Sequence, residues 1–525
     1  MHVRSVSEVM NSRTVLVRRV ISALLWLIFI MVVAKQASSI IHKQGIPIVA
    51  NDLEAFYCAG ETVLLKADPY LVEPLRACEH RLPNGGAFPA QFVTPTPQPG
   101  YTLGLFTLLT FMPYRTAAYV AFFVLAGVCV AIAIVVAKTT GAPSGAVALS
   151  LLVSGILASA TFGQIPPICA LGVAGAGLAL VCRRYTLAAV FAAIAMIEPH
   201  TGIATAIALF LFVPQTRIPL SLFALVLAGI SIATIGVHAN LEYFTRVLNE
   251  HAQAELFVND QYSLSHLLVR FTSDRFALAA GAFSFVIMLT IGLFLAPKAA
   301  RKLDSEACIA YVPPAATLLG GTFLHETQLI VALPAAFLFA MRGQGIVALA
   351  GRFLIIVLAA TPFTVFSEHT RNIVFLAATV AILSSLGTLH LFPKRENVAK
   401  LVVEWGLLTL LAIGPALIYP PPNGLALAAI RPQFADANVF GPNAQASLNW
   451  GALLRSDPKS FATEPGADIS KISFWLAIIF FLIVIPLPGT GAGREETRDA
   501  QTQGSYRRWV AGPEILVPRT FVGAV

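Results

Sequence analysis

The chain has 525 residues, of which 57% are hydrophobic and only 12% charged, and its mean hydropathy is +0.77. A soluble chain of this length could not cover its surface with so few charges, so the composition excludes a soluble globular protein. The formal net charge is +8. Lys and Arg nevertheless lie in short clusters between apolar runs, which is typical of cytoplasmic loops and argues against a nucleic-acid partner.

Apolar runs of about 18 or more residues recur along the chain and predict an all-α polytopic membrane protein. The first run follows Arg13, Arg18 and Arg19 and is interpreted as a spanning helix, because no convincing signal-peptide cleavage site accompanies it. The positive-inside rule then places both termini in the cytoplasm and gives about 12 spans. The predicted spans are 20–41, 115–137, 143–161, 165–182, 218–237, 276–297, 304–323, 328–341, 345–366, 373–391, 399–418 and 472–488.

Three long loops are expected outside the membrane, at about 42–100, 238–275 and 419–471. The second contains "LEYFTRVLNEHAQ", whose spacing predicts an amphipathic helix along the membrane interface. Residues 1–490 are therefore expected to form one transmembrane domain, followed by a cytoplasmic tail at 491–525.

Two segments depart from this simple pattern. Residues 101–112 are apolar but too short to span, and Met112-Pro113 interrupts them, so a short half-inserted or loop-packed helix is expected. Residues 186–213 hold two short apolar stretches around "IEPHTG", which predict either a re-entrant hairpin or a single kinked span.

The first outside loop begins with "NDLEAFYCAGETVLLKADPY", which places Asp52 and Glu54 near the outer membrane surface. These acids are either solvated loop groups or part of a site, since the neighbouring Tyr57 and other aromatic residues suit the face of a sugar. Cys58 and Cys78 share this loop, where a disulfide could persist.

This stretch resembles the first-loop pattern of glycosyltransferase family 87, polyprenyl-phosphate-sugar-dependent mannosyltransferases with a GT-C fold. "PGYTLGLFTLLTFMPYRTAAYV", "FGQIPPICALGVAGAGLALVCRRYTLAAVFAAIAMIEPH", "NDQYSLSHLLVRF" and "HETQLIVALPAAF" are similar to later family segments, in the same order. The resemblance covers roughly residues 45 to 340. Many members are expected to have a basic residue before the hairpin proline, whereas this chain has Glu198, so no anion-binding role is transferred to that position.

The resemblance implies an inverting transfer of a hexose, mannose above all, from a polyprenyl-phosphate donor to a lipid-linked or periplasmic glycan. The phosphate leaving group needs little acid assistance, whereas the acceptor hydroxyl must lose a proton as it attacks. Asp52 is therefore predicted to be the general base, with Glu54 as its nearest rival. Helical spacing puts these two carboxylates on different faces, so both are not expected to reach one hydroxyl.

Several further residues are predicted to contact substrate. His325 is expected at the donor phosphate or sugar, or else as an interfacial histidine, and Arg270 either clamps phosphate or extends to the interface. Gln164 either bonds substrate or satisfies a broken helix end, and Gln261 is a lining candidate. Glu198 and His200, at the hairpin tip, are ionisable candidates of lower rank.

No resident cofactor is expected, because neither zinc-ligand spacing nor a phosphate-cradling glycine-rich loop is present, although a divalent metal stays open. The resemblance implies a bacterial inner membrane enzyme whose site faces the periplasm, with membrane lipids as its surroundings. Two alternatives remain at this point. One is a transporter or flippase of a lipid-linked sugar, and the other is a different GT-C activity, such as transfer from a diphosphate carrier.

Overall fold

The structure is a computed structural model of the chain. It describes residues 19–20, 22–35, 51–82, 91–154, 159–160, 162–258, 261–365, 396–418, 437–456, 469 and 471–488. The predicted span at 373–391, most of the loop at 419–471 and the tail at 491–525 lie outside these residues. Two compact units are distinguished, Met1–Ile485 and Pro486–Val525, and the elements below belong to the first.

Regular structure in the described ranges is helical, with two isolated β-bridges, Leu71 with Gln445 and Gln261 with His325. Three helical runs there are long and apolar enough to cross a membrane: Tyr114–Thr140, Pro214–Glu255 and Asp274–Leu303. At about 1.5 Å per residue, the first and third exceed the ~30 Å hydrocarbon thickness. The all-α membrane class is therefore supported.

The predicted number of spans is not confirmed, because most of the other predicted runs coincide with shorter helices. The described part contains helix Ser22–Lys35 and the helices α6 (Ser144–Val153), α8 (Pro166–Val181), α15 (Ala307–Thr317), α16 (Leu333–Arg342) and α21 (Ile472–Ile483). Two longer elements, α17 (Ile346–Val365) and α19 (Glu396–Ile418), match the predicted spans at 345–366 and 399–418.

The short apolar segment after the first loop forms α4 (Gly100–Phe106) and a 3-10 turn, η1 (Thr107–Phe111), and ends before Pro113. It packs against α2 (Asn51–Leu64) and α11 (Arg217–Glu242). Close approach requires Gly60, since a Cβ there would lie 2.6 Å from the Phe106 backbone. The expectation of a short, packed helix is confirmed.

The "IEPHTG" segment forms two helices, α9 (Tyr185–Ala195) and α10 (Pro199–Phe212). The 3-10 turn η2 (Pro214–Thr216), which follows the far end of α10, returns to contact α9. The two helices therefore run side by side as a hairpin, which favours the predicted hairpin over a single kinked span. Pro199 occupies the first turn of α10, where its missing N–H breaks no helical bond.

The predicted amphipathic segment continues α11 through a π-helical turn, η3 (Tyr243–Val247), into α12 (Leu248–Glu255). Inside α11, Gly236 has φ +75° and kinks the helix. The Asn240 amide donates to the carbonyls of Gly236 and Ser231, at 2.7 and 3.0 Å, and so satisfies groups that the kink frees. Phe244 is exposed while Tyr243 is buried, so the two neighbouring aromatic side chains face different ways. The interfacial position of this segment stays a prediction.

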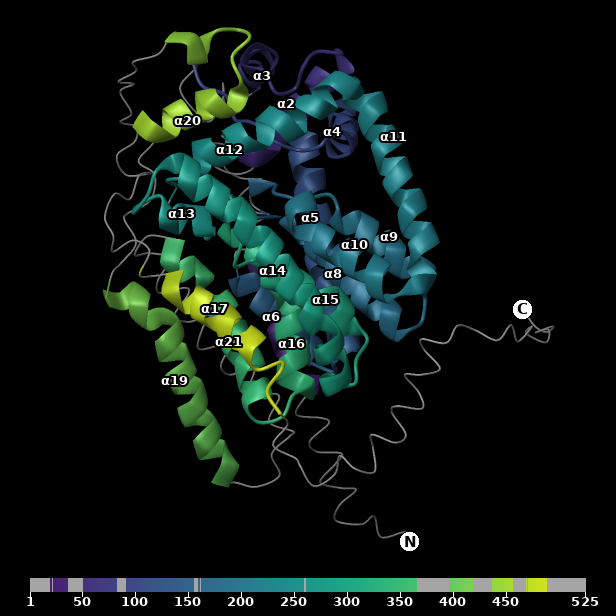
Figure 1. Cartoon of the computed structure of the whole chain (residues 1–525), viewed down its shortest axis with the longest axis vertical. Helices are drawn as coiled ribbons and strands as arrows, with labels where there is room; N and C mark the ends of the chain where they lie inside the picture. Colours follow the sequence, from purple (N-terminus) through teal and green to yellow (C-terminus); the bar gives the residue numbers. More distant parts are fainter. Residues whose placement is uncertain are drawn as a thin grey trace, which may run out of the picture. The chain divides into compact units, whose positions relative to one another are not determined.

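Short helices gather at one end of the longer ones, where Figure 1 shows α2, α3 (Val72–Glu79), α4, α12 and α20 (Ala446–Ser456) together. A disulfide between Cys58 and Cys78 joins α2 to α3, with the two Cα atoms 5.5 Å apart. The pairing that the sequence left open is therefore present. Backbone bonds at 2.9 and 2.8 Å, from Val72 to the Ala444 carbonyl and from Ala446 to the Tyr70 carbonyl, attach the segment before α20 to the same loop.

Candidate active site

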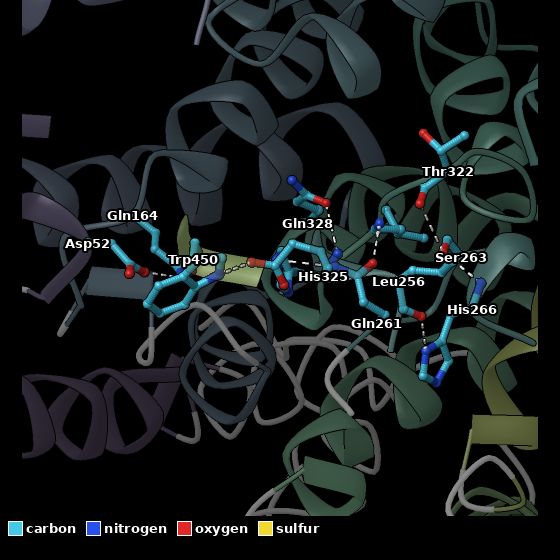
Figure 2. Close-up of polar contacts among 12 residues, drawn as sticks. Asp52, Gln164, Leu256, Gln261, Ser263, His266, Thr322, His325, Gln328 and Trp450 are labelled. Carbon is cyan, nitrogen blue, oxygen red and sulfur yellow. Dashed lines mark hydrogen bonds and ion pairs between the residues drawn. The ribbon is translucent and has the colours of Figure 1, made fainter. Parts of the chain in front are cut away.

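Asp52 lies half-buried in the first turn of α2. Its Oδ2 accepts a hydrogen bond from the side-chain amide of Gln164, and Figure 2 shows the two side chains facing each other. The predicted base and the predicted amide are therefore brought together. The bond orients one carboxylate oxygen of Asp52.

The turn before α8 explains how Gln164 reaches α2. Gly163 has φ +77°, a left-handed conformation that glycine adopts without strain, and a Cβ at this position would lie 2.6 Å from the Leu53 Cβ. The Gln164 N–H bonds the Ser159 carbonyl at 2.8 Å, which fixes the residue after the turn. Gly163 thus allows this turn to pack directly on α2 beside Asp52.

Glu54 has a different environment from Asp52. Only 3% of Glu54 is exposed, and its Oε1 has no hydrogen-bond partner. Burial raises the pKa of Glu54 to about 7. Glu79 on α3 is also buried and accepts the Thr94 N–H at 3.0 Å, and burial together with the charge of Glu54 raises the pKa of Glu79 well above its usual range. The helix therefore presents Asp52 half-exposed and directs Glu54 inward.

His325 and Gln261 are also brought together, through the β-bridge that joins them. The Gln261 Oε1 accepts the Leu324 N–H at 2.8 Å, and its Nε2 lies 3.3 Å from the His325 Nε2. The same imidazole nitrogen lies 3.9 Å from the Glu255 Oε2, and the other Glu255 oxygen accepts the Trp450 indole N–H. Trp450 and His325, both labelled in Figure 2, are therefore partners of the two different oxygens of one carboxylate.

Aromatic and imidazole rings surround His325. The Phe323 ring centroid lies 4.5 Å from His325, 4.8 Å from His251 and 5.9 Å from His200. Gln328 accepts the His325 backbone N–H at 2.9 Å. The hairpin tip, with His200, therefore lies beside the predicted phosphate-binding residue.

Neighbouring elements hold the hairpin tip in place. The Tyr101 hydroxyl of α4 donates to the Met196 carbonyl at 2.7 Å, and the Cys169 Sγ of α8 lies 3.1 Å from the Thr201 hydroxyl. Helix α8 starts two residues after Gln164 and also contacts η4 (Glu326–Ala332), which begins directly after His325. One helix therefore connects the surroundings of Asp52 with those of His325.

Tyr57 and Arg270 are the remaining predicted residues. The Tyr57 hydroxyl donates to the Met112 carbonyl at 3.1 Å, and its buried ring packs against Tyr114. Arg270 lies half-buried in the turn after α13 (Leu264–Leu268). Their predicted contacts with substrate stay predictions.

Sequence reasoning missed His251, Glu255 and Trp450. His251 and Glu255 are four residues apart on α12 and both are buried, so the amphipathic pattern could have indicated that they share an inward face. No local signal marked Trp450, which follows from tertiary packing. Among the described residues, no group of three or more His, Cys, Asp or Glu side chains could hold a metal ion.

The sequence model of glycosyltransferase family 87 matches residues 98–324. The match confirms the predicted resemblance, and it supports a membrane glycosyltransferase. It includes Gln164, Gln261 and Arg270 and ends one residue before His325, whereas Asp52 precedes it. No curated protein and no solved structure matches the chain.

Proposed function

We propose, from the premise that this chain is a glycosyltransferase of family 87, that it transfers a hexose from a polyprenyl-phosphate donor to a lipid-linked or secreted glycan. Mannose is the proposed sugar, and inversion at the anomeric carbon is the proposed outcome. The enzyme is placed in a bacterial inner membrane with its site towards the periplasm. The family match supports the glycosyltransferase part of this proposal, and the apolar helices support its membrane part.

The observation that carries the proposal is the bond between Asp52 and Gln164. A transfer to a hydroxyl needs a carboxylate that can accept the acceptor proton as the new glycosidic bond forms. Gln164 donates to one Asp52 oxygen, so the bond gives the carboxylate a defined orientation. Because Asp52 is half-buried rather than enclosed, an acceptor can approach it.

The donor phosphate is assigned to His325. The His325 Nε2 lies 3.9 Å from the Glu255 carboxylate, and a protonated imidazole at this position would suit a phosphate leaving group. Gln261 is proposed to line the same part of the site, since its amide faces the His325 ring. Arg270 and Tyr57 are proposed as further substrate contacts. Glu54 is the alternative candidate for the general base.

Purified protein in detergent or nanodiscs, supplied with polyprenyl-phosphate-[14C]mannose and membrane glycolipid acceptors, tests the function directly. The expected result is a mannosylated glycolipid and free polyprenyl phosphate, in equal amounts. Movement of the intact donor across proteoliposomes, without a glycosidic product, would instead show a flippase. Product formed only from a diphosphate-linked donor would identify the other GT-C activity.

A further inference from the structure

Helix α20 approaches α12 at a single glycine. A Cβ at Gly451 would lie 3.1 Å from the Ala254 Cα and 3.0 Å from its Cβ, so glycine allows the two backbones to come close. Trp450 and Glu255, the adjacent residues, are joined by the indole-to-carboxylate hydrogen bond. The close packing and the bond therefore occur at the same contact between the helices.

Residue Glu255 is 6% exposed, and burial of a charge without partners is costly. Its two oxygens face different groups: Oε1 accepts from Trp450, and Oε2 lies 3.9 Å from the His325 Nε2. Because the indole N–H can only donate, it fixes the carboxylate in its accepting role and directs the second oxygen to the imidazole.

The same segment is also attached to the loop that follows the Asp52 helix. Asn449 accepts the Val93 N–H at 2.9 Å and donates to the Gln91 carbonyl at 3.1 Å. Together with the backbone bonds of Ala444 and Ala446 to residues 70–72, these contacts fix α20 on the first outside loop. Neither α20 nor His325 lies in the region that matches the family.

We infer that α20 positions His325: Trp450 holds the Glu255 carboxylate, and Glu255 orients the His325 imidazole towards the donor phosphate. Trp450 and Glu255 are thus positioning residues that act through His325. The phosphate part of this inference rests on the proposed function. The contact between α20, Glu255 and His325 does not, and it is tested separately.

Other ionisable groups lie near His325 and affect the pH dependence of its protonation. His200 stands on α10, Glu198 at the hairpin tip, His251 on α12 with Glu255, and Glu326 begins η4. A positive charge on any one of the three imidazoles disfavours a charge on the other two, whereas Glu255 favours a charged His325. Replacement of Glu255 alone should therefore shift the equilibrium between charged and neutral His325 towards the neutral imidazole.

The test uses full-length Glu255→Gln, Trp450→Phe and the double variant. Trp26→Phe is the matched control, because the Trp26 indole bonds the Ser144 hydroxyl at 3.1 Å on a helix outside the site. For Glu255→Gln the donor KM is expected to rise roughly tenfold, and for Trp450→Phe roughly threefold, with the acceptor KM unchanged. The double variant should be no worse than Glu255→Gln, because the inferred effect of Trp450 on His325 passes through that carboxylate.

A second readout does not depend on the donor. Carbethoxylation of His325 by diethyl pyrocarbonate, followed by peptide mass spectrometry across pH, reports the fraction of neutral imidazole. Its midpoint should move to lower pH in Glu255→Gln and stay in place in Trp26→Phe. An unmoved midpoint, or fully additive effects in the double variant, would overturn the inference. A moved midpoint in an enzyme that transfers no mannose would uphold the contact and reject the proposed function.

Discussion

Gln164 donates a hydrogen bond to the carboxylate of Asp52 across 112 positions of sequence. One partner belongs to helix α2 and the other to the turn before α8, inside the region that matches family 87. Asp52 itself lies outside the matched region, and this bond connects it to a residue that the match includes.

Replacement of Gln164 by Leu should reduce kcat roughly tenfold, because the loss of one hydrogen bond to a charged group releases the orientation of Asp52. The side chains are similar in size, so the fold should persist. Gln344→Leu, at an exposed position between α16 and α17, is the control and should leave kcat unchanged. Steady-state kinetics of the two variants measure the change in kcat. Equal rates in both variants would show that Asp52 needs no orientation by Gln164.

Gly163→Ala should impair both stability and activity, since alanine at φ +77° is strained and its Cβ would collide with Leu53. A backbone penalty on the order of 1–3 kcal/mol is expected. Gly127→Ala is the matched control, because a Cβ there meets nothing within 4 Å. Thermal unfolding in detergent should separate the two variants. A Gly163→Ala protein as stable as the control would contradict the described turn.

Glu54 predicts a pH-dependent stability. Its folded pKa of about 7 exceeds the ordinary value of 4.5, so the folded state keeps a proton that the unfolded state releases. The free energy of unfolding should therefore fall as pH rises from about 4.5 to about 7, by up to ~3 kcal/mol, and then level off. Glu54→Gln removes the ionisable group, and with it the fall in the free energy of unfolding as pH rises. The variant should match the wild type at pH 4 and exceed it at pH 8, as measured by thermal unfolding. Parallel pH curves for the two proteins would contradict the burial of an ionisable group at this position.

The disulfide between Cys58 and Cys78 should stabilise the Asp52 helix against α3. The two cysteines are 20 positions apart, and closure of a loop of this size contributes about 3 kcal/mol. The variant Cys58→Ser/Cys78→Ser, or addition of a reductant to the wild type, should lower Tm. Cys182→Ser, which changes an exposed free cysteine, is the control. A reductant that leaves the Tm of the wild type unchanged would contradict the prediction.

Patterns of residue type predicted those features that depend on local sequence. The low charge predicted the helical membrane class, the short run before Pro113 predicted α4, and the two stretches around "IEPHTG" predicted the α9–α10 hairpin. Asp52 and Gln164 were both candidates from the sequence, but only the Gly163 turn brings them into contact. Whether a glycine adopts a positive φ cannot be predicted from a single sequence.

The features that could not be predicted depend on packing between distant segments. Trp450 reaches Glu255 because α20 packs on α12 at Gly451, a relation between segments 195 positions apart. The predicted count of spans is not confirmed, for a related reason. Hydropathy reports how apolar a run is, whereas helix ends are set by turns and by contacts with neighbouring elements. Within the predicted span 304–323, for example, α15 ends at Thr317, before Gly320 and Gly321.

The most direct test of the central claim is the single-turnover rate of Asp52→Asn with saturating polyprenyl-phosphate-mannose. Glu54→Gln and Glu61→Gln, on the same helix, are run alongside it. If Asp52 accepts the acceptor proton, Asp52→Asn should lose roughly 10²- to 10⁴-fold in rate while it still binds the donor, and both glutamate variants should stay within a few-fold of the wild type. A wild-type rate in Asp52→Asn, or the large loss in Glu54→Gln instead, would contradict the account.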